Sequence, residues 1–290
     1  MISIVTATYN REKLLKRLYN SLCKQESKLF EWIVIDDGSI DNTENLITEF
    51  KNENTINIIY LKKVNGGKHT ALNLGIELAN FPYIFFVDSD DVLPENSIKT
   101  IIDKIGKISL RSDYKNLAGI CGDKALLDGQ VVGSVLEDEI VCSYIDFRYK
   151  YKIIGDKAEI FKTEVLKKYK FPVFENEKFC PEGLIWNRIS NEYDMYFFSE
   201  IVYLCEYQEG GLTDQIYQIR KKSPNATLLY YKELFLMKNI SFYFRVRALI
   251  NFWRFYLVSL KSPIEIEPPQ TIMNSLVRNT LKIFFMFKKL

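Results

Sequence analysis

The sequence predicts an α/β fold with a mostly parallel sheet, and three observations support that prediction. Within the first 95 residues, short apolar runs rich in Val and Ile alternate with segments whose apolar residues recur at helical spacing. The runs are apolar at almost every position, as in strands that are covered on both faces. Polar clusters follow three of these runs, and the carboxyl ends of parallel strands form the edge at which ligands bind.

The elements can be placed in order along the chain. β-Branched and aromatic runs predict strands at 2–7, 32–35, 57–61 and 83–87. Helices are expected at 11–23, from Asp41 onward and at 69–79. Asp41 could cap its helix, because Glu44 follows at the spacing of a capping box. Later signals are mixed, and they predict strands at 119–122 and 130–133 and helices at 157–169, 181–191, 226–260 and 271–290.

The composition is that of a folded protein without a strong overall charge. Hydrophobic residues make up 47% of the chain, and 39 Lys and Arg stand against 37 Asp and Glu. These values argue against a disordered chain and against a general nucleic-acid binder. Five scattered cysteines without a Cys-x-x-Cys pair favour reduced thiols over disulfides or a zinc site. No apolar run reaches the ~20 residues of a membrane span and no signal peptide is recognisable, so the expected location is cytoplasmic.

The charge is unevenly distributed along the chain. Residues 226–290 carry a net charge of +7 and 13 aromatic side chains, which leaves −5 for residues 1–225. The sequence is therefore divided into a main domain at 1–222, with halves at 1–95 and 96–222, and a C-terminal region at 223–290. Basic helices with aromatic faces can lie at a membrane surface. The alternative is a helical appendage that packs on the main domain or forms a homodimer.

The first polar cluster with chemical potential is Asp88, Ser89, Asp90 and Asp91, directly after a predicted strand. Three carboxylates this close repel one another unless a cation or another partner compensates. Mg²⁺ and Mn²⁺ prefer such oxygen ligands and often share them with substrate phosphates. The alternative is an acidic turn in which Asp91 caps the next helix.

Asp36 and Asp37 follow another predicted strand. A carboxylate at that position can accept hydrogen bonds from a nucleobase N–H or from ribose hydroxyls. The alternative is that these residues cap the helix that follows.

A third cluster contains Gly66, Gly67, Lys68 and His69 at the start of a predicted helix. Paired glycines permit close approach of the backbone, and a helix N-terminus favours anions, to which Lys68 would add a positive charge. The spacing is not that of a Walker loop. His69 is the only histidine, which excludes a multi-histidine zinc site, and it is expected to be hydrogen-bonded in a structural role.

The fourth cluster centres on Pro181 and Glu182. Proline suits the first turn of a helix, which places Glu182 at the helix start. There, Glu182 could stabilise the helix dipole or serve as a general base, and the residues alone slightly favour the first role.

Taken together, these motifs resemble family 2 glycosyltransferases of the GT-A fold, of the type that builds bacterial surface polysaccharides. The matching segments are residues 5–11, 34–43, 65–73 and 86–91, with weaker matches at 179–188 and 207–213. The resemblance implies a Rossmann-like, mostly parallel GT-A sheet with a C-terminal helical extension. It also implies transfer of a sugar from a nucleotide-diphosphate donor, a UDP-sugar by preference, to an acceptor hydroxyl with inversion, in capsule or cell-surface polysaccharide synthesis.

The resemblance also implies roles for individual residues. Asp88 and Asp90 would bind Mn²⁺ or Mg²⁺, and Glu182 would be the catalytic base. The family's usual Glu-Asp pair lacks its second member here, so Glu175 and Glu177 remain alternatives. The implied nucleotide-binding residues are Thr8, Tyr9, Asn10, Arg11, Asp36, Asp37, Gly66, Gly67, Lys68, Asp88 and Ser89.

The partners implied are a nucleotide sugar and a saccharide or lipid-linked saccharide, with no nucleic acid. Region 223–290 would provide peripheral contact with the inner face of the cell membrane or a homodimer interface. Two other functions stay open. A sugar nucleotidyltransferase usually has a glycine-rich loop after its first strand, and Thr8–Arg11 contains no glycine. A catalytically silent nucleotide-binding partner of another transferase would need none of the three acidic site residues.

Overall fold

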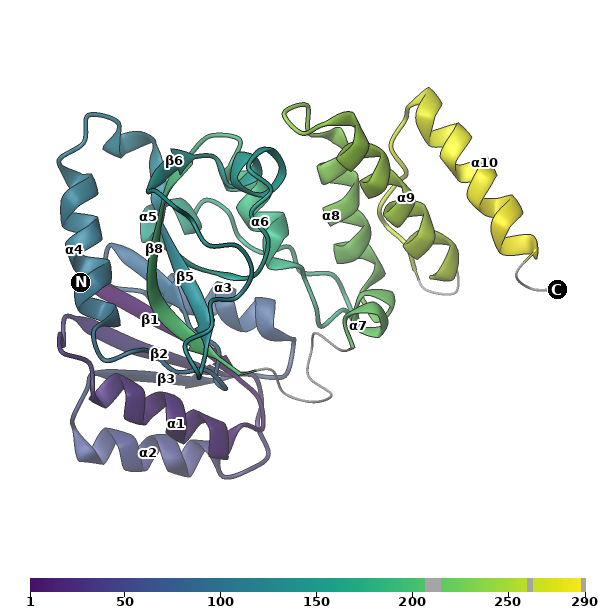
Figure 1. Cartoon of the computed structure of the whole chain (residues 1–290). Helices are drawn as coiled ribbons and strands as arrows, with labels where there is room; N and C mark the ends of the chain where they lie inside the picture. Colours follow the sequence, from purple (N-terminus) through teal and green to yellow (C-terminus); the bar gives the residue numbers. More distant parts are fainter. Residues whose placement is uncertain (207–214, 260–262, 288–290) are drawn as a thin grey trace.

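A computed structural model describes residues 1–206, 215–259 and 263–287, with only the backbone at 272 and at 281–287. The described part is built on an eight-stranded mixed sheet with the order β3-β2-β1-β4-β7-β5-β8-β6. The strands are β1 (Ile2–Thr8), β2 (Phe30–Asp36), β3 (Ile58–Lys62), β4 (Tyr83–Phe86), β5 (Leu117–Leu126), β6 (Ile140–Cys142), β7 (Lys157–Lys162) and β8 (Asp194–Cys205). The first four strands are parallel, whereas β7 runs antiparallel to both β4 and β5. The predicted α/β sheet is confirmed (Figure 1).

Strand register brings the polar clusters to one edge of the sheet. Thr8 pairs with Asp36, and Val5 pairs with Phe86. The turn after β1, the aspartates at the end of β2 and the acidic run after β4 therefore leave the sheet at neighbouring positions. This is the edge that the parallel strand pattern predicts for a ligand site.

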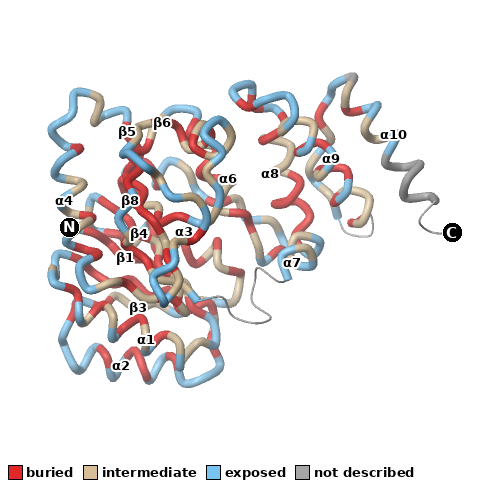
Figure 2. The backbone as a smooth tube through the Cα atoms, in the orientation of Figure 1, coloured by how far each residue is buried: buried red, intermediate tan, exposed pale blue. Residues whose placement is uncertain are grey.

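Helices cover both faces of the sheet. One face packs against α1 (Glu12–Cys23), α2 (Thr43–Glu53) and α4 (Ser97–Ser109). The other face packs against α3 (Lys68–Leu78), the short α5 (Thr163–Leu166) and α6 (Glu182–Ile189). Each face buries its own apolar cluster, and the central strands are buried along most of their length (Figure 2). Burial on both faces explains why the first strands are apolar at successive positions.

Four C-terminal helices lie beyond α6 in the described residues: α7 (Ile216–Lys222), α8 (Pro224–Leu236), α9 (Phe242–Val258) and α10 (Ile272–Phe287) (Figure 1). They form a third apolar cluster around Leu249 and Phe252. Trp253 donates a 2.6 Å hydrogen bond to Asn274, which joins α9 to α10. None of the described helices is long and apolar enough to cross a membrane.

The C-terminal helices also contact the main domain. Arg188 on α6 forms two hydrogen bonds with Glu233 on α8, at 2.9 and 2.6 Å. Ala226 on α8 is buried in the same apolar cluster as Trp186 on α6. Because α7 packs on both α8 and α9, helix contacts cross the expected boundary after residue 222. The division into 1–222 and 223–290 stays a prediction.

The helix predicted at 157–169 is wrong. Residues 157–162 form β7, which pairs with strands on both sides, and only the four residues of α5 that follow are helical. Lys157, Ala158 and Glu159 are more common in helices than in strands, and the strand forms there because its conformation is set by non-local neighbours. The segment expected as a strand at 130–133 contributes a single bridge, between Val131 and Ala125.

Other boundaries also differ from expectation. The helix expected at 226–260 is two helices, interrupted at 237–241. The structure also contains a 3-10 helix at Tyr114–Asn116 and a π-helix at Asp146–Lys150. The expected capping box does not form, since Asp41 accepts from the Thr43 N–H and hydroxyl and Glu44 pairs with Lys62 instead. The weakly matching segment 207–213 lies outside the described residues.

Candidate active site

The turn after β1 is tied to the loop after β2. Asn10 has a φ of 52°, in the left-handed region that asparagine tolerates. Its side-chain oxygen accepts a 2.8 Å hydrogen bond from the Ile40 N–H, and its own N–H donates to the Ser39 hydroxyl at 2.9 Å. Thr8 is buried, and its hydroxyl has no partner within the described residues, whereas Tyr9 is 47% exposed. The turn is thus fixed by side chains of the neighbouring loop and presents Tyr9 to solvent.

Asp36 and Asp37 are buried and bonded within the protein. Asp36 accepts hydrogen bonds from the Ser39 N–H and from the Tyr60 hydroxyl, at 2.7 and 2.8 Å. Asp37 accepts from the N–H groups of Gly66 and Gly67, at 2.9 and 2.7 Å. Both carboxylates therefore organise the loops around the site. Nucleotide contact by these two residues stays a prediction.

Asp37 is also paired with a cation. The Lys63 ammonium lies 2.6 Å from the Asp37 carboxylate and donates to the Thr70 hydroxyl at 2.9 Å. Sequence reasoning missed Lys63, although its position just before the glycine pair could have suggested it. The pairing compensates the charge of a carboxylate that is only 3% exposed.

At Gly67, the backbone packs closely against the backbone at Lys178. The φ of Gly67 is 93°, and a Cβ atom at this position would lie 2.1 Å from the carbonyl oxygen of Lys178. A side chain would therefore collide with rigid backbone as well as strain the conformation. The glycine lets the start of α3 lie against the loop that leads to α6, which brings Lys68 next to Glu182.

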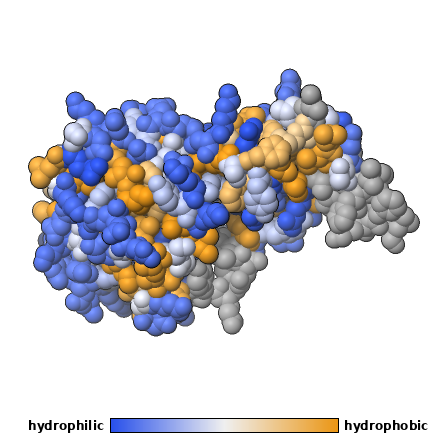
Figure 3. Space-filling model, turned by 45° about the horizontal axis from the view of Figure 1, so that its top comes forward, coloured by the Kyte–Doolittle hydropathy of each residue, from blue (hydrophilic) through white to orange (hydrophobic). Residues whose placement is uncertain are grey.

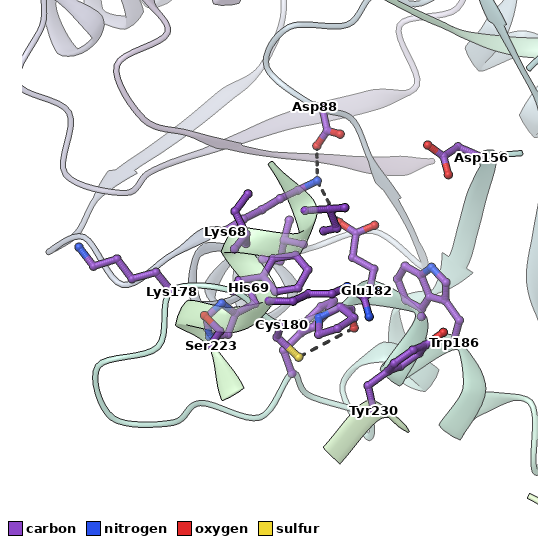
Figure 4. Close-up of a pocket in the computed structure, with 18 of the residues that line it drawn as sticks. Lys68, His69, Asp88, Asp156, Lys178, Cys180, Glu182, Trp186, Ser223 and Tyr230 are labelled. Atoms are coloured by element: carbon purple, nitrogen blue, oxygen red, sulfur yellow. Dashed lines mark hydrogen bonds and ion pairs between the residues drawn. The ribbon is translucent and has the colours of Figure 1, made fainter. Parts of the chain in front are cut away.

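Lys68 connects two acidic residues at the centre of the site. Its ammonium lies 2.6 Å from an Asp88 carboxylate oxygen and 2.9 Å from a Glu182 carboxylate oxygen (Figure 4). Burial alone would lower the pKa of Lys68, but Asp88 and Glu182 outweigh it and raise that pKa. Burial likewise opposes the charge on Asp88, whose pKa is held below its ordinary value by Lys68 and Lys124. Three charged groups are thus in contact here: Asp88 from the loop after β4, Lys68 from α3 and Glu182 from α6.

The last aspartate of the acidic run has a structural role. Asp91 is 7% exposed and accepts a 2.7 Å hydrogen bond from the Tyr203 hydroxyl, which itself accepts from the Asp88 N–H at 2.9 Å. Burial and the neighbouring Asp88 raise the pKa of Asp91 to about 7. Asp91 does not cap the next helix, because α4 begins at Ser97. Tyr203 lies on β8, a strand that was not among those predicted, although its run of aromatic and β-branched residues is typical of a strand.

Asp88 and Asp90 have the chemistry of ligands for a hard divalent cation. Asp90 pairs with Arg11 through one oxygen, at 3.3 Å, and the side chains of Asp88 and Asp90 are 39% and 25% exposed. In the described part, the second carboxylate oxygen of each has no hydrogen-bond partner. No group of three acidic, Cys or His side chains there could hold a metal by itself. Two carboxylates suit an ion that also takes ligands from a substrate phosphate.

A cavity of about 820 Å³ opens beside this centre. Lys68, Asp88 and Glu182 line it together with residues of β5, β7, α7 and α8 (Figure 4). The turn at 8–11 and the two aspartates after β2 do not line it. Of the predicted nucleotide-binding residues, Lys68 and Asp88 line the cavity.

Glu182 is the candidate base that faces the cavity. It is the first residue of α6, and Pro181 precedes the helix as its N-cap residue. Glu177 is buried, and its two oxygens accept from the N–H groups of Asn225 and Ala226 at 2.6 and 2.9 Å. Glu175 is exposed, and neither it nor Glu177 lines the cavity. The geometry favours Glu182 over the two alternatives.

His69 differs from the expected hydrogen-bonded histidine. It lines the cavity and is 3% exposed, and its Nδ1 has no hydrogen-bond partner in the described part of the chain. Burial lowers the pKa of His69 to about 4, so the ring is neutral at pH 7. A neutral imidazole at this place can accept or donate one hydrogen bond to a bound ligand.

The fold resembles that of solved GT-A proteins. The structure of residues 1–349 of S. aureus TarS in complex with UDP-GlcNAc matches with a TM-score of 0.62 at 20% identity, and covers 98% of this chain and 80% of that one. The mannosyltransferase PcManGT from Pyrobaculum calidifontis, in complex with GDP-Man and Mn²⁺, matches with a TM-score of 0.58 at 13% identity and the same coverage. The predicted GT-A fold is confirmed.

Residues 3–111 match the model of glycosyl transferase family 2. The chain is 26% identical over 203 residues to poly-beta-1,6-N-acetyl-D-glucosamine synthase of Staphylococcus epidermidis, covering 64% of this chain and 49% of that protein. It is 27% identical over 199 residues to GalNAc(5)-diNAcBac-PP-undecaprenol beta-1,3-glucosyltransferase of Campylobacter jejuni, covering 67% and 61%. The chain thus spans about half to three fifths of these relatives.

Proposed function

We propose that this chain transfers a sugar from a nucleotide-diphosphate donor to an acceptor hydroxyl, with inversion at the anomeric carbon. The main support for the proposal is that Asp88 and Glu182 both contact Lys68, at 2.6 and 2.9 Å from its ammonium. Asp88 belongs to the edge expected for the nucleotide, and Glu182 faces the cavity expected for the acceptor. A donor phosphate and an acceptor hydroxyl would meet between them.

Each side chain has a separate role in the proposed reaction. Glu182 takes the proton of the acceptor hydroxyl as that oxygen attacks the anomeric carbon. Lys68 holds Glu182 and Asp88 in place and keeps their charges compensated. Asp88 and Asp90 would hold Mn²⁺ or Mg²⁺, which stabilises the negative charge on the leaving diphosphate when it is bound. A single direct displacement needs one base and inverts the anomeric carbon.

The relatives support a more specific version of the proposal. TarS was solved with UDP-GlcNAc, and the two curated relatives are named for an N-acetylglucosamine polymer and for an undecaprenol-linked saccharide. We therefore propose a UDP-sugar as donor and a saccharide or lipid-linked saccharide of bacterial surface polysaccharide as acceptor. A sugar nucleotidyltransferase or a silent nucleotide-binding partner would not need a base facing the cavity.

The proposal is tested with a panel of UDP-, GDP- and dTDP-sugars. We expect slow release of UDP from one UDP-sugar in the presence of Mn²⁺ or Mg²⁺, and loss of that release when EDTA is added. Coupled detection of free nucleoside diphosphate measures it. Absence of release from every donor, or formation of a UDP-sugar from UTP and a sugar phosphate, would contradict the transferase proposal.

We also propose peripheral contact of the C-terminal helices with an anionic membrane surface. At the turn between α8 and α9, Leu236, Phe242 and Tyr243 are 47%, 66% and 68% exposed. Lys238 and Arg247 are exposed beside them. Hydrophobic surface also gathers over the C-terminal helices in Figure 3. Apolar side chains flanked by cations suit an interface with anionic lipids.

Vesicle flotation tests this contact. The full chain is expected to float with vesicles that contain phosphatidylglycerol at low salt and to be released at high salt. The double variant Phe242→Ser, Tyr243→Ser should lose binding. Leu110→Ser, which removes a residue that is 89% exposed after α4, should retain it. The idea fails if the unmodified chain ignores anionic vesicles, or if light scattering shows a dimer that the double variant abolishes.

A further inference from the structure

The side chains that line the cavity beside Glu182 include more cations than carboxylates. Lys68 is paired with Asp88 and Glu182, and Lys157 is paired with buried Asp123 at 2.5 Å. Deeper in the cavity, Arg148 lies 3.6 Å from Glu159. Lys68 compensates only one of its two carboxylates. Lys124, which lines the cavity without an ion pair among the described residues, offsets the other, so these groups together are close to neutral.

Three further cations that line the cavity have no carboxylate partner among the described residues. They are Lys178, on the loop before α6, and Arg220 and Lys222, both on α7. Lys178 and Lys222 are exposed. The lining carboxylate without an ion pair, Asp156, lies on the opposite side of the Lys68–Glu182 pair from Lys178 in Figure 4. The lining of the cavity therefore carries excess positive charge.

Arg220 is held by aromatic side chains. One of its N–H groups donates to the Tyr231 hydroxyl at 2.7 Å, and its guanidinium lies 5.4 and 5.3 Å from the ring centres of Tyr230 and Tyr231. A guanidinium has five N–H donors, so further donors remain for a ligand. An arginine that is positioned by rings keeps its full charge for an incoming anion.

We assign these cations to the acceptor. They line the cavity together with Glu182, whereas most residues expected to bind the nucleotide, among them the turn at 8–11, do not line it; Lys68 and Asp88 are the exceptions. A carboxylate brings one negative charge to three cations, but a phosphate monoester or a diphosphate brings up to two and has more oxygens that accept hydrogen bonds. The charge balance therefore suits a terminal phosphate or a diphosphate better than a uronic acid.

We infer that the acceptor is a phosphate-bearing saccharide or polyol. Lys178, Arg220 and Lys222 bind its phosphate, while Glu182 faces the hydroxyl that receives the sugar. This inference rests on the proposed function and specifies its substrate class. The phosphate can belong to a free polymer or to a lipid-linked saccharide, and the experiment separates these two sources.

The experiment measures binding to the full chain in the presence of UDP. The probes are a fluorescent glycerol-phosphate oligomer that ends in a phosphate monoester, a neutral dextran of similar length and an oligogalacturonate. The phosphate oligomer should bind at least about tenfold more tightly than the other two. Vesicles that carry a prenyl-diphosphate saccharide form a second arm, and tighter binding in either phosphate arm identifies the source.

Lys222→Gln should weaken phosphate binding about tenfold, and the double variant Lys178→Gln, Lys222→Gln should weaken it further. Lys221→Gln is the matched control, because Lys221 is the exposed neighbour that does not line the cavity. The inference is overturned if dextran or oligogalacturonate binds equally well, or if Lys221→Gln has the same effect. A parallel loss of UDP affinity would assign the lysines to the donor and overturn it too.

Release of UDP from the donor with water as acceptor is measured in the same samples. If that release persists while the phosphate probes do not bind, the result contradicts only the inference about the acceptor and leaves the proposed function in place. If release is absent as well, the proposed function itself has failed.

Discussion

Replacing Glu182 by glutamine is expected to slow sugar transfer by about 10²–10⁴-fold, since a general base contributes a factor of this size. The amide keeps the volume of the side chain but cannot accept the proton of the acceptor hydroxyl. Donor binding should be retained, because Lys68 keeps its 2.6 Å contact with Asp88. Initial rates of product formation, with calorimetry of UDP binding, measure the two effects separately.

Glu175→Gln is the matched control for this experiment. Glu175 precedes the same helix and carries the same change of charge, but it is exposed and does not line the cavity. We expect its rate to stay within about twofold of the unmodified chain, as for surface changes in general. A fully active Glu182→Gln variant, or an inactive Glu175→Gln variant, would show that the base has been assigned to the wrong residue.

Replacing Asp90 by alanine is expected to remove metal-dependent transfer, with a loss of about 10²–10³-fold if the ion supplies several kcal/mol of stabilisation to the leaving group. The carboxylate is 25% exposed and pairs with Arg11 at 3.3 Å, so its loss leaves a partly solvated cation rather than a buried one. The fold should therefore persist. Rates measured across a range of Mn²⁺ concentrations report the effect.

The control for this second variant is Asp103→Ala. Asp103 is exposed on α4, which covers the sheet away from the polar edge, and the change in net charge is the same. It should keep both the rate and the dependence on Mn²⁺. The assignment of Asp90 would have to be abandoned if Asp90→Ala showed the Mn²⁺ dependence of the unmodified chain.

The first half of the fold could be predicted because its strands and helices are marked by local patterns. The strand at 2–7 is a continuous, mostly apolar run and the helix at 11–23 has apolar residues at helical spacing, and parallel pairing then places the polar clusters on one edge. The strand β7 could not be predicted, because residues 157–162 become a strand only between β4 and β5. β8 has an aromatic and β-branched run that is typical of a strand, but its place beside β5 depends on pairing far along the chain.

The site shows the same limit. Residue types and spacing singled out Asp88, Lys68 and Glu182 separately, but their meeting depends on three elements that packing brings together. Tyr203 gave no signal, although it bonds to both the Asp88 N–H and Asp91. Composition alone could not show which aromatic side chains of the C-terminal region are exposed. Phe252 and Trp253, for example, are buried in the apolar cluster of the C-terminal helices.

The carboxylate of Glu177 has a consequence for how this chain can be divided. It accepts hydrogen bonds from the first N–H groups of α8 at 2.6 and 2.9 Å, and five residues later the same segment places Glu182 against Lys68. Removing the C-terminal helices would leave this carboxylate without its partners and release one end of the segment that positions Glu182. The helices are thus not an interchangeable module, and a chimera that exchanges them would have to reproduce the contact with Glu177.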